Sequence, residues 1–191
     1  MTQFSIIFLL ILCADSGLKL WLNLRQKHAI HKSFNQVPVP FDQHITLEEH
    51  QKAARYNLAK LTENRYELAY SALLVLIFTL GGGIDWIAQS FNLANYPLTS
   101  EVLLIVIYTL FNSLLVLPFS YYSTFKIEQR FGFNNTTLKL FIVDLIKGTL
   151  LGLVIGVPLL YLVMWLMNNL GNQWWLWVWG VLVVFNLLIL I

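Results

Sequence analysis

The sequence predicts an all-α, polytopic membrane protein with five transmembrane helices. Composition is one reason, because 58% of the 191 residues are hydrophobic and only 12% are charged, whereas soluble domains carry about 25% charged residues. The second reason is that the apolar residues gather in runs of about 20, the length that crosses a hydrocarbon core about 30 Å thick. The lysines and arginines concentrate in two segments between these runs. A net charge of +2 gives no reason to expect a nucleic-acid partner, so the expected partner is a lipid bilayer.

The first predicted span covers residues 3–24 and carries two charges within an apolar run. Asp15 and Lys19 are four residues apart and therefore share one face of a helix. Charges inside a membrane are costly unless they pair or face a polar interior. Two explanations stay open for this pair: a structural ion pair near the helix end, or one side of a water-lined cavity.

Residues 25–67 form a polar segment that we expect on the cytosolic side. Thr46-Leu47-Glu48-Glu49 has the form of a capping box, with Thr at the N-cap and Glu three residues later. The pattern predicts one long helix that starts near Leu47, is amphipathic and cytosolic in its first half, and continues as the second span at residues 68–91. Gly81-Gly82-Gly83 should kink that span or let a neighbouring helix approach closely.

The third predicted span covers residues 101–122, and Pro118 should kink its end. A cytosolic loop of residues 123–137 is expected to follow, and it is the longest polar break in the second half of the chain. Gly132 offers a helix stop or a positive-φ turn. Asn134 to Thr137 supply the N-cap candidates for the next helix.

The fourth predicted span covers residues 138–168, which as a helix measures about 46 Å and must tilt or project beyond the bilayer. An acidic residue and three glycines recur at every fourth position and form one stripe: Asp144, Gly148, Gly152 and Gly156. Glycines at this spacing are typical of close helix packing in membranes. Lys147 lies one helical turn from Asp144, so these two charges form a second candidate intramembrane pair.

The fifth predicted span covers residues 174–191 and opens with Trp174-Trp175-Leu176-Trp177-Val178-Trp179. Tryptophans gathered in this way are typical of the membrane–water interface. The sequence stops at Ile191 with no flanking charge, cap or polar tail. From this we expect a fragment, or a domain of a longer protein.

The distribution of cations predicts the orientation of the helices. Nine of the twelve lysines and arginines lie in residues 25–67 and 123–137, Lys139 lies at the start of the fourth span, and the other two connections contain none. Because cytoplasmic loops of membrane proteins carry an excess of Lys and Arg, both basic segments should be cytoplasmic. The N-terminus is then expected outside, and Ile191 at the cytoplasmic face.

The sequence contains no recognisable catalytic or metal-binding set. It has no His-Glu-x-x-His, no phosphate loop and no Gly-x-Ser-x-Gly. His28-x-x-His31 has the spacing of zinc ligands, but nothing nearby completes a site. We therefore interpret the four histidines as solvated side chains of the first cytosolic segment.

The stretch that begins at Phe125 resembles a known family. Phe125-Lys126-Ile127-Glu128-Gln129-Arg130-Phe131-Gly132-Phe133-Asn134, followed by Thr137, Asp144 and Lys147, is similar to the signature Phe-x-Ile-Glu-x-Arg-Phe-Gly-Phe-Asn…Thr…Asp-x-x-Lys of type I CAAX prenyl endopeptidases. These are integral-membrane zinc metallopeptidases. Leu22-Asn23-Leu24-Arg25-Gln26, the helix from Leu47 to Tyr56 and the Trp174 cluster extend the resemblance over nearly the whole chain.

The resemblance implies the N-terminal, five-helix membrane domain of such a protease. In the family these helices enclose a water-filled chamber, and a His-Glu-x-x-His helix that binds zinc follows the fifth span. That catalytic zinc domain is absent from this chain, so no catalytic or metal residue can be assigned here and the chain alone should be inactive. It would need a downstream catalytic domain or a separate chain that carries one. A wet chamber would also explain the charges Asp15, Lys19, Asp144 and Lys147 as part of its lining.

A second functional hypothesis is a non-catalytic polytopic scaffold or small transporter that keeps the domain without the protease site. The membrane is also not fixed by the resemblance, because the family occurs in bacteria and in eukaryotes. The absence of long insertions favours a bacterial inner membrane over the endoplasmic reticulum.

Overall fold

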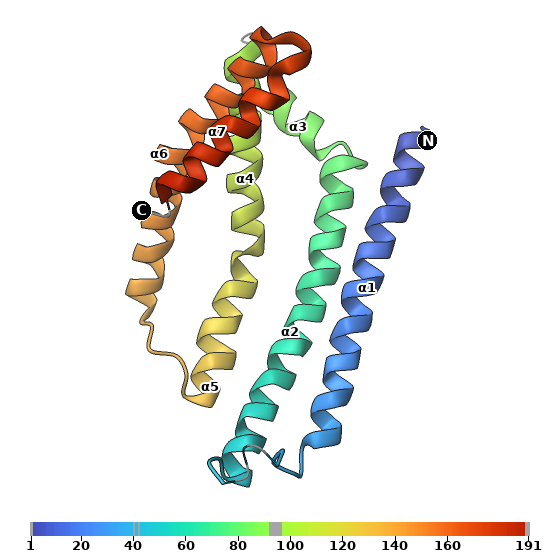
Figure 1. Cartoon of the computed structure of the whole chain (residues 1–191), viewed down its shortest axis with the longest axis vertical. Coiled ribbons are helices and arrows are strands. Elements are labelled where there is room, and N and C mark those ends of the chain that lie inside the picture. The colour runs from blue at the N-terminus through green and yellow to red at the C-terminus, as the bar shows by residue number, and fades with distance from the viewer. Residues whose placement is uncertain (1, 40, 42, 92–96, 190–191) are drawn as a thin grey trace. The chain divides into compact units, whose positions relative to one another are not determined.

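A computed structural model of the chain describes residues 2–39, 41, 43–91 and 97–189, and all regular elements in these ranges are helical (Figure 1). The chain divides into two compact units. The first unit consists of Met1–Gly83 and Asn112–Thr136, and the second of Ile84–Phe111 and Thr137–Ile191. Within the described residues, four helices are long and apolar enough to cross a membrane, or five if the bent pair α2 and α3 forms one span. The all-α transmembrane fold class is therefore confirmed.

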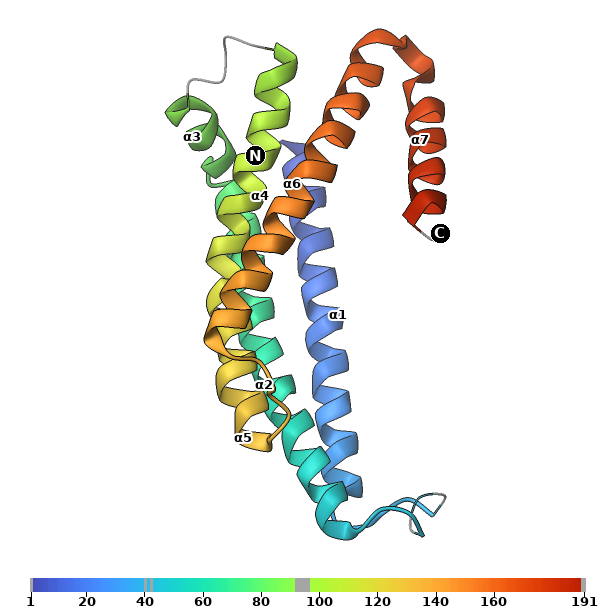
Figure 2. The same ribbon diagram turned by 90° about the vertical axis from the view of Figure 1, so that its left-hand side faces the viewer.

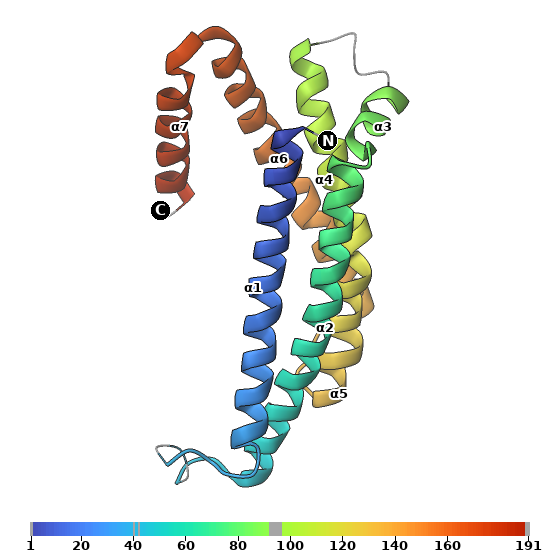
Figure 3. The same cartoon turned by 90° about the vertical axis from the view of Figure 1, so that its right-hand side faces the viewer.

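Two long helices form the larger part of the first unit. α1 covers Gln3–Ser33 and α2 covers Leu47–Thr79, and they lie side by side along most of their length (Figures 1 and 3). α1 thus continues well past residue 24, where we expected the span to end and a loop to begin. The reason is local, because no Gly or Pro occurs between Gly17 and Pro38 to stop the helix.

The second predicted span is not one continuous helix. α2 ends at Thr79, and a short helix, α3, begins at Gly83 and ends at Ser90. Gly82 has a φ of 76°, a left-handed conformation that glycine adopts without steric cost. A Cβ on Gly81 would lie 2.6 Å from the carbonyl oxygen of Ile77, and one on Gly83 would lie 2.9 Å from Phe78 Cα. The three glycines therefore break the span where the sequence predicted a kink.

The expected loop of residues 123–137 is helical over more than half of its length. α4 (Pro97–Tyr122) passes directly into a π-helix, η2 (Ser123–Glu128), and then into α5 (Gln129–Phe131). The helical stretch Leu98–Phe131 has 34 residues. It continues because the polar side chains after Tyr122 include no helix breaker before Gly132, whose φ of 79° ends it. Only Phe133 to Thr137 forms an extended connector.

The second unit contains a hairpin of two apolar helices. α6 (Leu138–Asn169) and α7 (Trp174–Ile189) are joined by the short 3-10 helix η3 (Gly171–Gln173), and the two helices diverge from this turn (Figure 2). Gly171, with a φ of 52°, opens the turn. The bounds of α6 agree closely with the fourth predicted span. Those of α7 agree with the fifth up to residue 189, and residues 190 and 191 lie outside the described part of the chain.

Few side chains are buried, as expected for helices whose outer surface faces lipid. The apolar side chains that are buried within the described residues are Ala54, Leu74, Phe78, Ile87, Val102, Ile127 and Leu166. Many large apolar side chains are instead exposed, for example Phe4 at 78% and Val154 at 71%. In water such a surface would drive aggregation, whereas in a bilayer it is matched by the acyl chains. The multi-pass membrane character is therefore plain from the structure.

The predicted capping box at the start of α2 is confirmed. Glu49 N–H donates to Thr46 Oγ1 at 3.3 Å, and Thr46 N–H donates to Glu49 Oε2 at 2.9 Å. The Thr46 hydroxyl also donates to Glu49 Oε2 at 2.8 Å. These bonds lower the pKa of Glu49 below its ordinary value of 4.5, and the bond from the Thr46 backbone has the largest effect. The ionised carboxylate therefore stabilises the helix start.

The capping box predicts a pH dependence of stability. A carboxyl group whose pKa is lower in the folded state than in the unfolded state stabilises the fold at pH values above its unfolded-state pKa. This stabilisation is lost as the pH falls through its folded-state pKa. In detergent, the melting temperature of the wild-type chain should drop more between about pH 6 and about pH 3 than that of Glu49→Gln. Glu48→Gln, which removes a neighbouring carboxylate outside the box, should keep the wild-type dependence. Identical profiles for Glu49→Gln and the wild type would contradict the assignment.

Candidate functional site

The segment that carries the family motif packs on the first half of α2. Ile127 is buried, at 5% exposure. The rings of Phe131 and Phe133 meet the ring of Tyr56 edge to face, with centroids 5.6 and 4.9 Å away and interplanar angles of 74° and 69°. Lys52 Nζ lies 5.5 Å from the centroid of the Phe133 ring. Aromatic pairs with this geometry add stability beyond the area that they bury, so the segment is fixed to α2 on one side.

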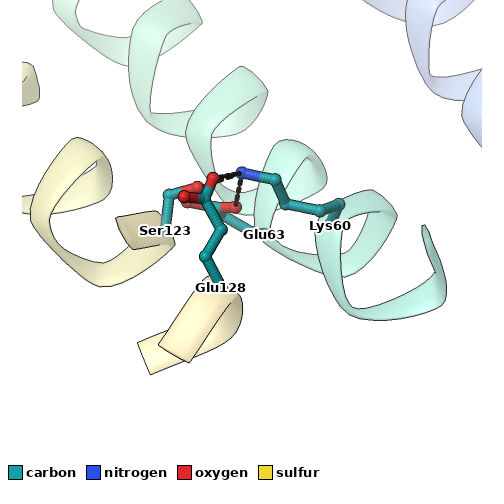
Figure 4. Close-up of polar contacts among 4 residues, drawn as sticks. All are labelled: Lys60, Glu63, Ser123 and Glu128. Atoms are coloured by element: carbon teal, nitrogen blue, oxygen red, sulfur yellow. Dashed lines mark hydrogen bonds and ion pairs between the residues drawn. The ribbon is translucent and has the colours of Figure 1, made fainter. Parts of the chain in front are cut away.

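A polar cluster of four residues, Lys60, Glu63, Ser123 and Glu128, holds the other side of the segment (Figure 4). Lys60 Nζ donates to Glu128 Oε1 at 3.2 Å and to the Ser123 hydroxyl, and it lies 3.8 Å from Glu63 Oε2. The side chain of Glu63 is only 8% exposed. One ammonium group therefore links α2 to both ends of η2.

The π-helical turn explains how Ser123 and Glu128 reach the same ammonium group. Residues five apart lie about 140° apart around an α-helix, at 100° per residue. In a π-helix the repeat is i→i+5, so residues five apart return close to one face. Ser123 and Glu128 are the first and last residues of η2. The wider turn thus presents a hydroxyl and a carboxylate together to Lys60.

Glu63 lies in the part of α2 that precedes the second predicted span. Burial raises the pKa of its carboxyl above the ordinary value of 4.5, and Lys60 and a hydrogen bond from Ser123 offset part of that increase. Glu67 and Glu128 add smaller repulsive contributions. The cluster therefore holds one ammonium group against two carboxylates, of which Glu63 is the more buried.

The end of the segment is built from residues with defined backbone roles. Gly132 takes a positive φ beside Lys52, whose Nζ would lie 3.9 Å from a Cβ at this position. Asn134 Oδ1 accepts a hydrogen bond from the N–H of Thr136 at 2.6 Å. Thr137 Oγ1 accepts from Leu140 N–H at 3.2 Å and caps α6, as predicted. Phe125 contacts the ring of Tyr121, with centroids 4.9 Å apart, and Arg130 lies over the ring of Phe131 at 5.8 Å.

A polar groove of ≈ 740 Å³ lies between α1 and α2 within the first unit. Asp15 and Lys19 line it and form an ion pair, with Lys19 Nζ 2.7 Å from Asp15 Oδ2. Asn23, one turn further along α1, is 5% exposed and donates from Nδ2 to the carbonyl oxygen of Leu61 at 2.9 Å. Its Oδ1 has no hydrogen-bond partner among the described residues. The other polar residues that line the groove are Ser16, Gln26, Asn57, Lys60, Asn64, Glu67 and Ser71.

The candidate residues on α6 belong to the second unit and make fewer contacts. Asp144 and Lys147 are exposed, and no ion pair joins them in the described part of the chain. A Cβ built on Gly148, Gly152 or Gly156 would meet no atom within 4 Å. The roles assigned to these residues, chamber lining and close helix packing, therefore stay predictions.

Sequence reasoning missed three residues that organise the site. Lys60 was counted only as one of many cytosolic cations, although its spacing to Glu63 puts both on one helical face. Ser123 gave no signal, because its role depends on the π-helical turn. Asn23 is a single amide in an otherwise apolar stretch, and such a residue is typical of a hydrogen bond between membrane helices.

The described residues contain no group of three or more His, Cys, Asp or Glu side chains placed to hold a metal ion. A catalytic zinc site needs three protein ligands around the ion. The side chains in this part of the chain therefore do not fit zinc, and no reaction step can be assigned to them.

Comparison with known proteins identifies what the chain resembles. The family described as CAAX prenyl protease N-terminal, five membrane helices, matches residues 26–191. A CAAX prenyl protease 1 homolog from Dictyostelium discoideum is 31% identical over 199 residues, and one from Homo sapiens is 28% identical over 174 residues. The crystal structure of S. mikatae Ste24p superposes with a TM-score of 0.87 at 26% identity and covers 98% of this chain.

The chain spans less than half the length of these proteins. The match to the Dictyostelium relative includes 98% of this chain and 45% of that protein. For the human relative the two shares are 86% and 36%, and the match to the S. mikatae structure includes 45% of that chain. These three proteins come from eukaryotes, so the comparisons do not support the expected preference for a bacterial inner membrane.

Lys60 provides a test of the polar cluster. Lys60→Met should lower the free energy of unfolding by about 2 kcal/mol, because it leaves Glu63 and Glu128 without their cation; fully buried pairs cost 3–5 kcal/mol. The smaller figure reflects the exposure of the Lys60 and Glu128 side chains, 34% and 30%. Chemical denaturation in detergent measures it. Adding Glu128→Gln to Lys60→Met should recover part of the loss, and Lys32→Met should change little. Additive losses from the two substitutions would contradict the cluster.

Proposed function

The chain belongs to the CAAX prenyl protease N-terminal family, and we propose that it forms the membrane domain of an integral-membrane zinc metalloendopeptidase. The observation that carries this proposal is the fold, since a TM-score of 0.87 over 98% of the chain accompanies 26% identity to S. mikatae Ste24p. The motif segment adds support, because its residues have defined structural roles on α2. The whole protein would act on peptide bonds near a prenylated C-terminus, as the names of the relatives suggest.

In this proposal the chain supplies the wall of an intramembrane chamber and no catalytic group. Zinc, bound by residues downstream of this chain, would polarise the peptide carbonyl and activate a water molecule. The groove between α1 and α2 supplies a hydrated face, on which Asp15 and Lys19 neutralise each other. Asp144 and Lys147 on α6 stay candidate chamber-lining charges in this proposal. The polar cluster at Lys60 would keep the segment after α4 in place at its rim.

The alternative of a scaffold or small transporter is not carried forward, because no observation favours it. A partner is needed for catalysis in our proposal, either a downstream domain or a separate chain. The next two experiments test the catalytic assignment and the orientation.

Measuring bound zinc tests whether the metal site lies in this chain or in a downstream region. The purified chain should hold well under one zinc ion per molecule. A chimera that continues this chain with the region following the match in the Dictyostelium relative should hold about one ion. The chimera should also cleave a prenylated peptide, and a chelator should abolish the cleavage. Stoichiometric zinc in the chain alone, or a folded chimera without zinc, would contradict the proposal.

Thiol labelling tests the predicted orientation. In a Cys13→Ser background, Lys32→Cys and Lys126→Cys should resist a membrane-impermeant thiol reagent applied to intact spheroplasts. Both should react after permeabilisation, because the two basic segments are cytoplasmic. Gln173→Cys, in the connection between α6 and α7, should react in intact spheroplasts. Labelling of the first two from outside would reverse the topology.

A further inference from the structure

A second cavity of the first unit combines apolar walls with a cationic rim. It has a volume of ≈ 690 Å³ and lies between α2 and the stretch from the end of α4 to α5. Its apolar lining consists of Leu58, Ala59, Pro118, Phe119, Ile127 and Phe131. Tyr66 and Tyr122 also line it and are 68% and 52% exposed. The polar groove between α1 and α2 shares none of these residues.

The charges that face this cavity are unbalanced. Three charged side chains line it: Glu63, Lys126 and Arg130. Glu63 Oε2 lies 3.8 Å from Lys60 Nζ, an ammonium group that Glu128 shares, so the lining itself holds two cations against one carboxylate. Lys126 and Arg130 are exposed and form no ion pair within the described residues. The rim therefore offers two cations with no protein counter-ion, and an anion is the missing component.

The position of the cavity along the helices fits the headgroup layer of a bilayer. The second predicted span begins at residue 68, just after Tyr66, and the third ends at Tyr122. Tyrosines at this level are typical of the membrane interface. Lys126 and Arg130 follow the end of the span, where basic side chains meet anionic headgroups. The apolar walls around Pro118 and Phe119 then lie at the level where acyl chains begin.

We propose that this cavity binds one anionic phospholipid of the leaflet beside the basic segments. Lys126 and Arg130 neutralise the net negative charge of its headgroup, and one acyl chain runs along the apolar wall at Pro118 and Phe119. A free anion would leave the apolar wall uncovered. A zwitterionic lipid such as phosphatidylcholine carries an ammonium group beside its phosphate, so it would bring no net negative charge to the two cations. The binding holds the π-helical segment from both sides, by the lipid at Lys126 and by Lys60 at Glu128. This inference concerns the chain itself and does not depend on proteolysis.

Native mass spectrometry of the full chain in detergent tests the site. We expect the first molecule of palmitoyl-oleoyl-phosphatidylserine to bind at least about tenfold more tightly than palmitoyl-oleoyl-phosphatidylcholine. Lys126→Gln with Arg130→Gln should abolish that preference. Lys27→Gln with Lys32→Gln removes the same charge from α1, outside the cavity, and should retain it. The swap Lys126→Arg with Arg130→Lys keeps both charges and should also retain it.

Two further arms separate a lipid from a free anion and the cavity from a general basic surface. Ala59→Trp fills the apolar part without changing charge and should weaken phosphatidylserine binding, with an unchanged melting temperature as evidence of folding. Glycerophosphoserine, which lacks acyl chains, should not displace the lipid. Equal loss in the Lys27 and Lys32 variant would overturn the proposal. So would full binding by a folded Ala59→Trp, displacement by glycerophosphoserine, or equal affinity for phosphatidylcholine.

Discussion

The bond between Lys60 and the π-helical turn is the interaction on which the first unit depends. Lys60 comes from the middle of α2, and Ser123 and Glu128 come from a stretch more than 60 residues further along the chain. Apolar packing alone specifies this junction weakly, because lipid competes with it as an apolar partner. The ion pair between Lys60 and Glu128 is partly buried, and Ser123 and Glu63 are further acceptors for the same ammonium group. These polar interactions are directional, and lipid acyl chains cannot replace them. The ammonium group therefore sets the register of the motif segment on α2, and the rings of Phe131 and Phe133 complete it on Tyr56.

Most of the fold could be predicted from the sequence because membrane spans are set by length and hydropathy. The capping box at Thr46 and the cap at Thr137 were predicted correctly because their patterns are local. The helix ends at Ser33 and Phe131 were missed because polar side chains were taken as loop, although polar residues continue a helix wherever no Gly or Pro stops it. The break at Leu80–Gly82 was predicted only as a weak point. Whether three glycines kink or end a helix depends on their φ angles, which composition does not reveal.

The candidate site was predictable in its residues but not in its contacts. Sequence resemblance marked Glu128, Phe131, Gly132 and Asn134, and the structure gives each a structural role. It could not mark Lys60, because the partner of Glu128 is determined by tertiary packing. The π-helical turn that brings Ser123 to the same ammonium group was equally invisible, since it has no sequence signature comparable to a cap. Asp15 and Lys19 on α1 were correctly matched with each other, because a spacing of four residues is enough to place two side chains on one face of a helix.

The two sides of α2 in this unit differ in a way that follows from the charges. On the side towards α1, Asp15 and Lys19 neutralise each other and amide side chains such as Asn23 supply further polar groups. Such a face is stable in a membrane only where water or protein covers it, which is what a chamber provides. On the side towards η2, the second cavity combines two cations, Lys126 and Arg130, with an apolar lining, and our proposal places it at the level of the headgroups. A lipid satisfies that combination and water does not. In our proposals α2 therefore lies between a hydrated groove and a lipid-filled cavity, and Lys60 lines the groove while its partner Glu63 lines the cavity.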